Sequence, residues 1–373
     1  MKRKFIIYFF CSIFLYNCTE KRKDAINTIT VNLDQKQDVS IFELFSKIDI
    51  IPLETNDLSL IKFVQKVIVN QGNIYVLDEM SKILVFSPEG KFLFKIDSKG
   101  MGPDEYLDIS DFDILNDSLS VLSAVDNRML IYDTNGHFVR KFSLPRISRA
   151  YNSFKNINND SIVFWTYDYE KRIKIYSKSA KRIFKEGIPE KDNIYRNFGI
   201  QIFPYSTFIP SVTDNRVFKI TPKSEIVEAY KWDFGKLNNT PEMTENAPKL
   251  KSQNEMKEFR KKVQSSEVIN YNFLKAGGNS RYIYTKLNHK NTHINIFYDK
   301  LSKKTYLFEK TTEKIKFYPL YWTDSYMIGF IPEKVSTVND IIPDVILNQE
   351  QIKIKNNLSK FDNPVLVKYY FKK

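Results

Sequence analysis

The chain has 373 residues, of which 42% are hydrophobic and 14% aromatic, so it has enough apolar side chains to form a core, which excludes a disordered protein. Its formal net charge of +13 could indicate a nucleic-acid-binding protein, but the basic residues are spread over the whole chain and no nucleic-acid-binding motif is present. We therefore expect no nucleic-acid partner, and one closed domain can account for the length.

The amino-terminal residues have the pattern of a bacterial export signal. Residues 2–4 are basic, and the apolar stretch at residues 5–16 is too short to cross a bilayer as a permanent helix. It ends in Leu15-Tyr16-Asn17-Cys18, which resembles the lipobox of bacterial lipoproteins except that Asn17 stands where Gly, Ala or Ser is usual. We predict a lipoprotein signal peptide at residues 1–17 and lipidation of Cys18. The alternative is an ordinary secretory signal cleaved nearby, which would also export the domain.

The cysteines agree with this prediction. Cys11 lies within the predicted signal peptide, so Cys18 would be the single cysteine after cleavage and no disulfide is expected. Several acyl chains on Cys18 would bind a membrane stably. Thr19 rather than Asp follows Cys18, which by known sorting rules favours the outer membrane and leaves either side of it open as the location. Residues 18–40 are predicted to be a tether.

A short pattern recurs along the rest of the chain: a basic residue, an alternating apolar run and usually an aromatic residue, followed by a turn. The copies end at Phe86, Tyr132, Tyr176, Ile220 and Phe297. Their spacings are 46, 44, 44 and 77 residues, so the unit is about 44 residues long and the last gap holds an insertion. A unit of this size with several short strands predicts a β-propeller, because one small sheet buries both faces only against its neighbours.

The predicted units, or blades, follow one another along the chain. The first five cover about residues 61–96, 112–142, 151–188, 198–234 and 271–308. Gly90 and Gly136 hold matching turn positions in the first two units, where the third and fourth have Ala180 and Ser224.

The sixth unit is one strand short. Its strands are expected at about residues 317–321, 326–331 and 365–371. Residues 48–53 have no partner in the first unit, so we predict that they complete the sixth and leave no sheet edge exposed. The prediction is an all-β, six-bladed β-propeller over residues 41–373, with the ring closed by the N- and C-terminal strands.

The long gap between the fourth and fifth copies contains helix signals. Thr240-Pro241-Glu242 combines an N-cap residue, a proline at the first helical position and an acidic residue in the first turn. Leu250, Met256, Phe259 and Val263 then follow at loosely helical spacing. We predict a short helical insertion between blades 4 and 5, at about residues 240–268, over one face of the ring.

Five segments carry a family resemblance. They are residues 51–55 (IPLET), 72–78 (GNIYVLD), 99–106 (KGMGPDEY), 232–236 (WDFGK) and 362–367 (DNPVLV). With them the chain resembles a family of bacterial six-bladed β-propeller lipoproteins related to the NHL and TolB-like propellers. The resemblance implies the fold and an envelope location, but the family has no established general activity. Its members often lie near polysaccharide-uptake genes, which favours a glycan as the ligand.

The sharpest local feature is the loop at residues 99–106, where the chain crosses from one blade to the next. Its two glycines could turn backbone N–H groups towards an anion, and its two acidic residues could bind a cation or sugar hydroxyls. We predict ligand contacts from six of its residues: Lys99, Gly100, Gly102, Asp104, Glu105 and Tyr106. The alternative is structural, with the glycines in a tight turn and the acidic residues capping it.

Aromatic residues form a second candidate binding surface. Trp165, Tyr167 and Tyr169 alternate along one predicted strand, so their rings could share a face and stack on sugars or cations. Packing between blades uses the same residue types and is the alternative. Tyr318, Tyr321 and Trp322 in the sixth unit leave the same two possibilities open.

Catalytic motifs are scarce. The sequence has three histidines, His137, His289 and His293, and it contains no zinc-ligand spacing, serine-hydrolase elbow or nucleotide-binding loop. We therefore predict no catalytic residue and no cofactor. Metal ligands stay unassigned, because scattered Asp, Asn and Glu residues can form a metal site near a propeller axis.

Two functions follow from this. The first is an envelope-anchored binding or scaffold module, bound to the membrane through its lipid, that presents a propeller face to a glycan, peptide or protein. The alternative is a metal-assisted hydrolase or lyase acting on a lactone or sugar at the axial channel. Carboxylates that converge on the axis would favour the enzyme, and a mixed lining would favour the binding module.

Overall fold

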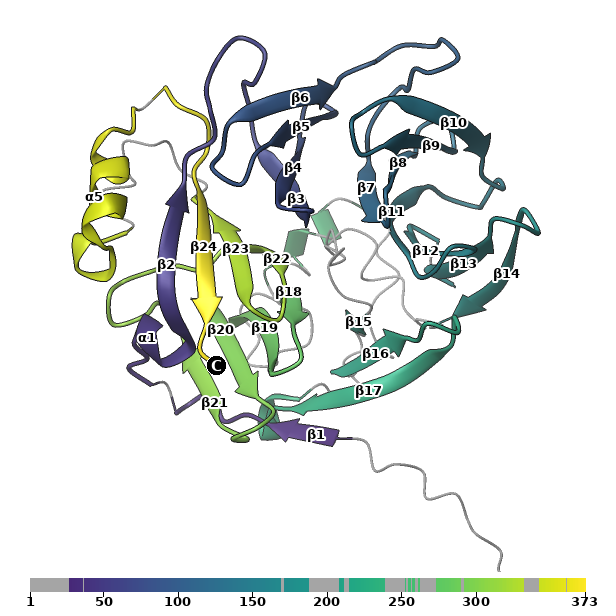
Figure 1. The fold of residues 1–373 in the computed structure, drawn as a ribbon. Coiled ribbons are helices and arrows are strands. Elements are labelled where there is room, and N and C mark those ends of the chain that lie inside the picture. Colours follow the sequence, from purple (N-terminus) through teal and green to yellow (C-terminus); the bar gives the residue numbers. More distant parts are fainter. Residues whose placement is uncertain are drawn as a thin grey trace, which may run out of the picture.

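The computed structural model is a ring of six small sheets, the blades of a β-propeller (Figure 1). It describes residues 27–187 except 36, 169 and 170; 208–210; 215–238; 273–331 except 290 and 291; 342–373 except 360; and six positions between 252 and 261. The predicted fold class and the number of blades are confirmed.

Blades 1 to 3 are each built from four consecutive antiparallel strands, with the first strand nearest the ring axis (Figure 1). Blade 1 consists of β3 (Val64–Asn70), β4 (Asn73–Asp78), β5 (Lys82–Phe86) and β6 (Phe92–Ile96). Blade 2 consists of β7 (Asp111–Leu115), β8 (Ser118–Ser123), β9 (Arg128–Asp133) and β10 (Phe138–Ser143). Blade 3 consists of β11 (Tyr151–Asn156), β12 (Ser161–Thr166), β13 (Ile173–Ser177) and β14 (Arg182–Gly187).

The two ends of the chain meet in blade 6. Blade 5 consists of β18 (Phe273–Gly278), β19 (Tyr282–His289), β20 (Thr292–Asp299) and β21 (Thr305–Phe308). Blade 6 consists of β22 (Pro319–Trp322), β23 (Tyr326–Phe330), β24 (Leu366–Phe371) and the N-terminal β2 (Phe45–Ile51). β2 pairs antiparallel with β24 over its whole length, from Phe45 opposite Phe371 to Ile51 opposite Leu366. The predicted closure of the ring by both ends of the chain is confirmed.

Blade 4 takes a strand from the amino-terminal segment. It contains β15 (Phe208–Pro210), β16 (Arg216–Ile220) and β17 (Ile226–Asp233), and β1 (Asn27–Thr30) pairs with β17 in parallel. Alternate residues of this segment, Ile29, Val31 and Leu33, are buried against blades 4 and 5. Part of the segment predicted as a tether is therefore a strand, because its apolar alternation matches the free edge of β17.

The turns between the third and fourth strands determine how neighbouring blades meet. Gly90 and Gly136 have φ angles of 85° and 86°. A Cβ atom would lie 1.9 Å from the Pro52 carbonyl oxygen at Gly90 and 2.6 Å from the Phe94 ring at Gly136. Both turns need glycine, because the backbone conformation disfavours side chains and the preceding blade approaches closely. In blades 3 and 4 the residues with positive φ in this turn are Lys181 and Ser224.

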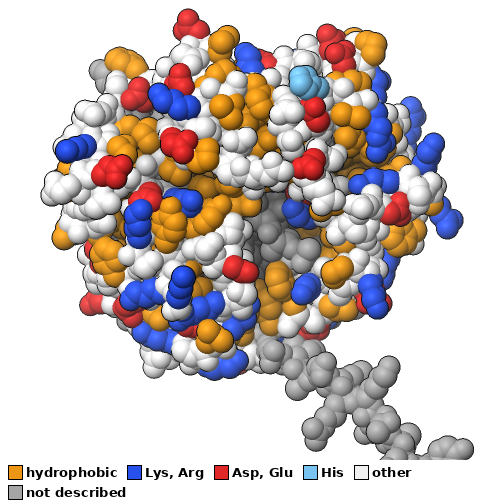
Figure 2. Space-filling model, viewed as in Figure 1, with side chains coloured by type: hydrophobic (Ala, Val, Ile, Leu, Met, Phe, Trp, Pro, Cys, Tyr) orange, Lys and Arg blue, Asp and Glu red, His pale blue; other side chains and the backbone are white. Residues whose placement is uncertain are grey.

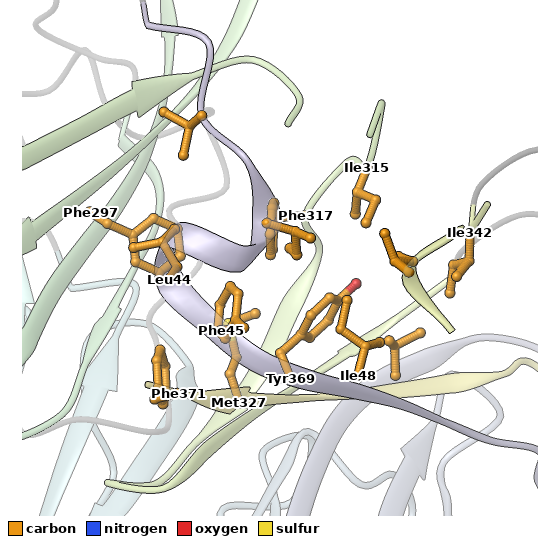
Figure 3. Packing of buried hydrophobic residues seen from close by; sticks show 14 of the residues in the cluster. Leu44, Phe45, Ile48, Phe297, Ile315, Phe317, Met327, Ile342, Tyr369 and Phe371 are labelled. Atoms are coloured by element: carbon orange, nitrogen blue, oxygen red, sulfur yellow. The ribbon is translucent and has the colours of Figure 1, made fainter. Parts of the chain in front are cut away.

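The core between blades 5 and 6 is rich in aromatic rings (Figure 3). The ring centre of Phe45 lies 6.2 Å from that of Phe297, 5.8 Å from Phe317, 5.3 Å from Tyr369 and 5.1 Å from Phe371. Such pairs contribute about 0.5–1.5 kcal/mol each beyond the burial of their area. The N-terminal strand β2 is therefore held by side-chain packing as well as by backbone pairing.

Helices are few in the described part of the chain. α1 (Ile41–Leu44) begins with a capping box, and the 3-10 helix η2 (Gly235–Leu237) follows β17. Between β23 and β24 lie the 3-10 helix η4 (Asp344–Ile346) and then α5 (Gln349–Asn356). The predicted insertion at residues 240–268 lies mostly outside the described residues, although positions 254, 255, 257, 258 and 261 are helical. No helix that the structure describes combines the length and apolar character needed to cross a membrane.

Candidate functional site

A cavity of about 250 Å³ lies where inner strands of four blades converge, and we call it the axial pocket. Its lining comes from the second half of each of these inner strands: Ile68, Val69 and Asn70 of β3, Ile114 of β7, Lys155 of β11, and Tyr321 and Trp322 of β22. Figure 2 shows a hollow at the centre of the ring. Aliphatic, aromatic, amide and ammonium groups thus face one small space.

The carboxylate of Asp113, which pairs with the lining residue Lys155, has both of its oxygens engaged by neighbouring residues. Asp113 of β7 is completely buried, and its Oδ1 lies 2.6 Å from Nζ of Lys155. Its Oδ2 accepts hydrogen bonds from the backbone N–H of Asn156 at 2.9 Å and from the Asn156 side chain at 3.0 Å. Asp113 therefore joins β7 to β11 and holds the partly exposed Lys155 side chain beside the pocket.

A second buried ion pair joins blades 1, 2 and 3 beside the axis. Nζ of Lys66 lies 2.7 Å from Oδ1 of Asp111 and donates to the Phe112 carbonyl at 2.6 Å. The other oxygen of Asp111 accepts from the backbone N–H of Phe154 at 2.8 Å. Burial raises the pKa of Asp111 and lowers the pKa of Lys66, because desolvation opposes both charges. Asp111, like Asp113, links neighbouring inner strands.

The remaining polar groups of the axial pocket can receive a ligand. Nδ2 of Asn70 is buried and has no hydrogen-bond partner among the described residues. The Tyr321 hydroxyl donates to the Val69 carbonyl at 3.0 Å, which fixes its ring at the pocket wall. The Trp322 indole fits against Gly277, where a Cβ atom would lie 2.6 Å from Nε1. An unpartnered amide donor in the same pocket as a fixed tyrosine ring suits a ligand that carries hydroxyl or carbonyl acceptors.

In the loop at residues 99–106, two of the side chains predicted to contact a ligand instead bind other groups of the protein. Oε2 of Glu105 accepts from the Gly102 N–H at 2.6 Å and would lie 2.1 Å from a Cβ atom on Gly100. Tyr106 is buried, and its hydroxyl donates to the Ser81 carbonyl at 3.0 Å. Lys99 and Asp104 are exposed, so these two side chains are accessible on the loop. Neither Gly100 nor Gly102 has a positive φ, so the glycines do not serve the backbone conformation that the structural alternative expected; they make room for the Glu105 carboxylate, which caps the turn as that alternative predicted. Ligand contact here stays a prediction.

The predicted aromatic surface is divided between core and solvent. Trp165 is buried between blades 3 and 4, against residues that include Ile173 and Ile220. Tyr167 is 48% exposed, and its hydroxyl donates to Asn152 Oδ1 at 2.8 Å. Tyr169 lies outside the described residues. Trp165 thus serves blade packing, and Tyr167 is the accessible ring of the two that the structure describes.

Most residues of the axial pocket carried no signal in the sequence. Asn70, Ile114 and Lys155 come from three different blades and belong to no motif. Their shared feature is position, because each lies in the last three residues of an inner strand. The repeat could have identified these positions once the first strand of every blade was aligned.

The described residues contain no group of three or more His, Cys, Asp and Glu side chains placed to hold a metal ion. The exposed His137 instead contacts a carboxylate of its own turn, with Nδ1 3.0 Å from Asp133 Oδ2. The sequence left metal ligands unassigned, and the described part of the chain offers no candidate set of them.

Comparison with known proteins gives a family and a fold. The family model of a domain of unknown function, DUF4934, matches residues 25–370. A solved protein of Bacteroides fragilis NCTC 9343, described as exported, is similar with a TM-score of 0.70 and 17% identity over 93% of this chain and 100% of its own. A DUF4221 member from Bacteroides vulgatus ATCC 8482 has a TM-score of 0.47 and 13% identity over 90% and 99% of the two chains. No curated protein matches.

Proposed function

The chain belongs to the DUF4934 family, and from this premise we propose that it is an exported, lipid-anchored binding or scaffold module of the bacterial envelope. The propeller would present its axial pocket and loops to a glycan, peptide or protein partner. Lipid on Cys18 would hold it at the outer membrane. The similarity to a protein described as exported supports the location.

The observation that carries the binding function is the mixed lining of the axial pocket. Asn70 offers an unpartnered amide donor, Tyr321 and the edge of the largely buried Trp322 line the wall, and Lys155 offers a partly exposed basic side chain. The nearby Asp111 and Asp113 hold lysines and backbone N–H groups of the neighbouring strand instead of converging on the pocket centre. A pocket of this kind recognises a ligand by stacking and hydrogen bonds.

Ligand binding is tested with the mature protein on arrays of glycans and peptides. Hits are then titrated by tryptophan fluorescence, because Trp322 lies in the pocket wall. We expect Asn70→Ala to weaken binding by at least about tenfold, which corresponds to about 1.4 kcal/mol. Asn135→Ala, in an exposed outer turn, is the matched control and should leave affinity unchanged. Equal affinity for both variants and the wild type would show that the ligand binds elsewhere.

The lipid anchor is tested through the two cysteines of the precursor. Cys18→Ser should abolish incorporation of labelled palmitate and release the protein from membranes. Cys11→Ser, within the predicted signal peptide, should leave both unchanged. Palmitate labelling that survives Cys18→Ser would contradict the proposed lipid anchor at Cys18. The proposal predicts that the Cys18→Ser protein is still exported but is no longer labelled.

A further inference from the structure

Four lysine side chains in the described part of the protein are buried, and three of them pair with a carboxylate. Lys66 pairs with Asp111 at 2.7 Å, Lys174 with Glu186 at 2.7 Å, and Lys355 with Asp344 at 2.6 Å. The fourth, Lys286 of β19, is only 7% exposed. No carboxylate among the described residues pairs with Lys286, so this ammonium differs from the other three.

The surroundings of Lys286 are basic and aromatic. Its Nζ donates to the Phe317 carbonyl at 3.0 Å and lies 4.5 Å from the centre of the Tyr318 ring. Lys316, in the connection to blade 6, is near enough to repel the charge, and His293 of β20 is near enough to be repelled by it. One backbone carbonyl therefore satisfies one of the three N–H donors of Lys286.

This arrangement places positive charge between blades 5 and 6 without a described counter-charge. Burial lowers the pKa of Lys286 to about 8, and repulsion by Lys316 acts in the same direction, so the amine is still mostly protonated at pH 7. Burial and the charge of Lys286 lower the pKa of His293, whose neutral ring then serves as a hydrogen-bond donor or acceptor. A buried ammonium without an anion is costly, and a bound anion would remove that cost.

We propose that Lys286 is the centre of an oxyanion-binding site between blades 5 and 6, which takes a carboxylate, sulfate or phosphate group. The remaining N–H donors of Lys286 bind the oxygens, with the exposed Lys316 and His293 near enough to contribute to the site. The site is separate from the axial pocket, which is lined further along β22 by Tyr321 and Trp322. Acidic sugars, sulfated glycans and phosphate esters all carry the required group, so an anionic ligand could engage this site whatever occupies the axis.

The experiment uses the mature protein with sodium sulfate, sodium phosphate or sodium glucuronate, at ionic strength held constant with chloride. Thermal unfolding reports binding, since an anion that binds the folded state raises the Tm in a saturable way. Lysine NMR titration reports the site itself, because bound anion should raise the pKa of Lys286. We expect at least one of the three anions to saturate, with millimolar affinity that Lys286→Met weakens more than tenfold.

Lys353→Met, on the exposed side of α5, is the matched control and should keep wild-type affinity. Circular dichroism of each variant verifies the fold. The preferred anion then identifies the ligand source: glucuronate indicates an acidic sugar, sulfate a sulfated glycan, and phosphate a phosphate ester. The proposal is overturned if no anion saturates, or if Lys316→Ala abolishes the effect while Lys286→Met leaves it intact, which would indicate surface screening.

Discussion

Asn363 joins two segments that lie about three hundred residues apart in the chain. Its Oδ1 accepts from the Ile61 N–H at 2.8 Å, and its Nδ2 donates to the carbonyls of Glu54 and Ser59, each at 2.8 Å. Its own N–H donates to the Thr55 hydroxyl at 2.8 Å. Two of the segments that carry the family resemblance therefore bind each other, beside the closing strand β2.

Replacement of Asn363 should destabilise this junction strongly. Asn363→Ala removes the partner of the Ile61 N–H and of the Ser59 carbonyl in a buried place, while the Glu54 carbonyl keeps its hydrogen bond from the Ser59 hydroxyl. We expect a loss of about 3 kcal/mol in the free energy of unfolding. Urea unfolding measures the loss. Asn135→Ala, exposed and without a comparable role, should change the stability by less than about 0.5 kcal/mol. Similar midpoints for the two variants would contradict the role assigned to Asn363.

Lys286 should give the protein a distinctive pH dependence. Its pKa is about 8 in the folded protein against a usual 10.5, so burial penalises the charged form in the folded state. Below pH 8 both states are protonated and the whole penalty is present; between pH 8 and 10.5 the folded state loses its proton first and the penalty declines. The free energy of unfolding should therefore rise with pH over this interval, by at most about 3 kcal/mol.

The contribution of Lys286 to this pH dependence is measured by comparing the wild type with Lys286→Met in buffers free of polyvalent anions. The variant should lack the rise, and below pH 8 it should be as stable as the wild type or more stable, because a buried unpaired charge has been removed. The groups that face Lys286 are His293 of β20 and Lys316 and Tyr318 from the connection to β22, and all three remain in the variant. Parallel pH profiles would contradict this account.

At the scale of elements, the turn between the third and fourth strands controls how blades meet. Gly90→Ala places a Cβ 1.9 Å from the Pro52 carbonyl oxygen at a φ of 85°, so the turn must shift away from β2. We expect a cost of more than about 2 kcal/mol, from the backbone conformation together with the clash. The measurement is the urea midpoint at constant slope.

Gly235→Ala is the matched control for this prediction. Gly235 also has a positive φ, 60°, but a Cβ there meets nothing within 4 Å. The substitution should lower the free energy of unfolding by about 1 kcal/mol, which is the cost of holding alanine at a positive φ. Equal losses at Gly90 and Gly235 would show that the contact with the preceding blade has no energetic importance.

Most strands could be predicted from the sequence because the apolar alternation repeats at a fixed period. The third strands β5, β9, β13, β16 and β20 contain the repeated pattern, and the residue at its end is buried in every copy. α5 was not predicted, because just Gln351 and Lys355 of its residues are buried and its sequence has no continuous apolar stripe. β1 was missed for a different reason. Its four residues lie beside a polar segment and look like part of a linker, and only the free edge of β17, with which they pair, makes them a strand.

The candidate site was harder to predict than the fold. Asn70 of blade 1 and Tyr321 of blade 6 are 251 residues apart and meet only when the ring closes. Lys286 of blade 5 and Lys316, in the connection to blade 6, meet only when these two blades pack together. The sequence did single out Trp165, but its burial between blades is decided by neighbours such as Ile220. The repeat predicts which strands exist, whereas the axial pocket depends on which particular side chains four different inner strands contribute.

At the scale of the molecule, the β2 strand should decide whether the ring forms. A chain that begins at residue 52 loses β2 together with six buried residues of the cluster shared by blades 5 and 6: Val39, Ile41, Leu44, Phe45, Ile48 and Ile50. This removes on the order of 10 kcal/mol of burial, comparable with the whole stability of a domain. It also exposes the edge of β24, which can pair with another chain.

We expect the protein truncated before residue 52 to self-associate or to lose cooperative unfolding, as measured by light scattering and urea titration. The control is a chain that begins at residue 27, which retains β1 and β2 and should remain monomeric with the wild-type midpoint. A monomeric, cooperatively folded product of the longer truncation would show that three strands of blade 6 suffice.

β1 also determines how a mechanical load applied at the amino end enters the protein. The load reaches the four-residue pairing of β1 with β17 before it reaches β2, which is seven residues long and packed against aromatic rings. Detachment of residues 27–36 would add about 30 Å of extended chain, up to Gln37, whose N–H bonds to the Leu307 carbonyl. With the proposed lipid anchor at Cys18, a pull on the amino end would thus lengthen the connection while the six blades stay closed.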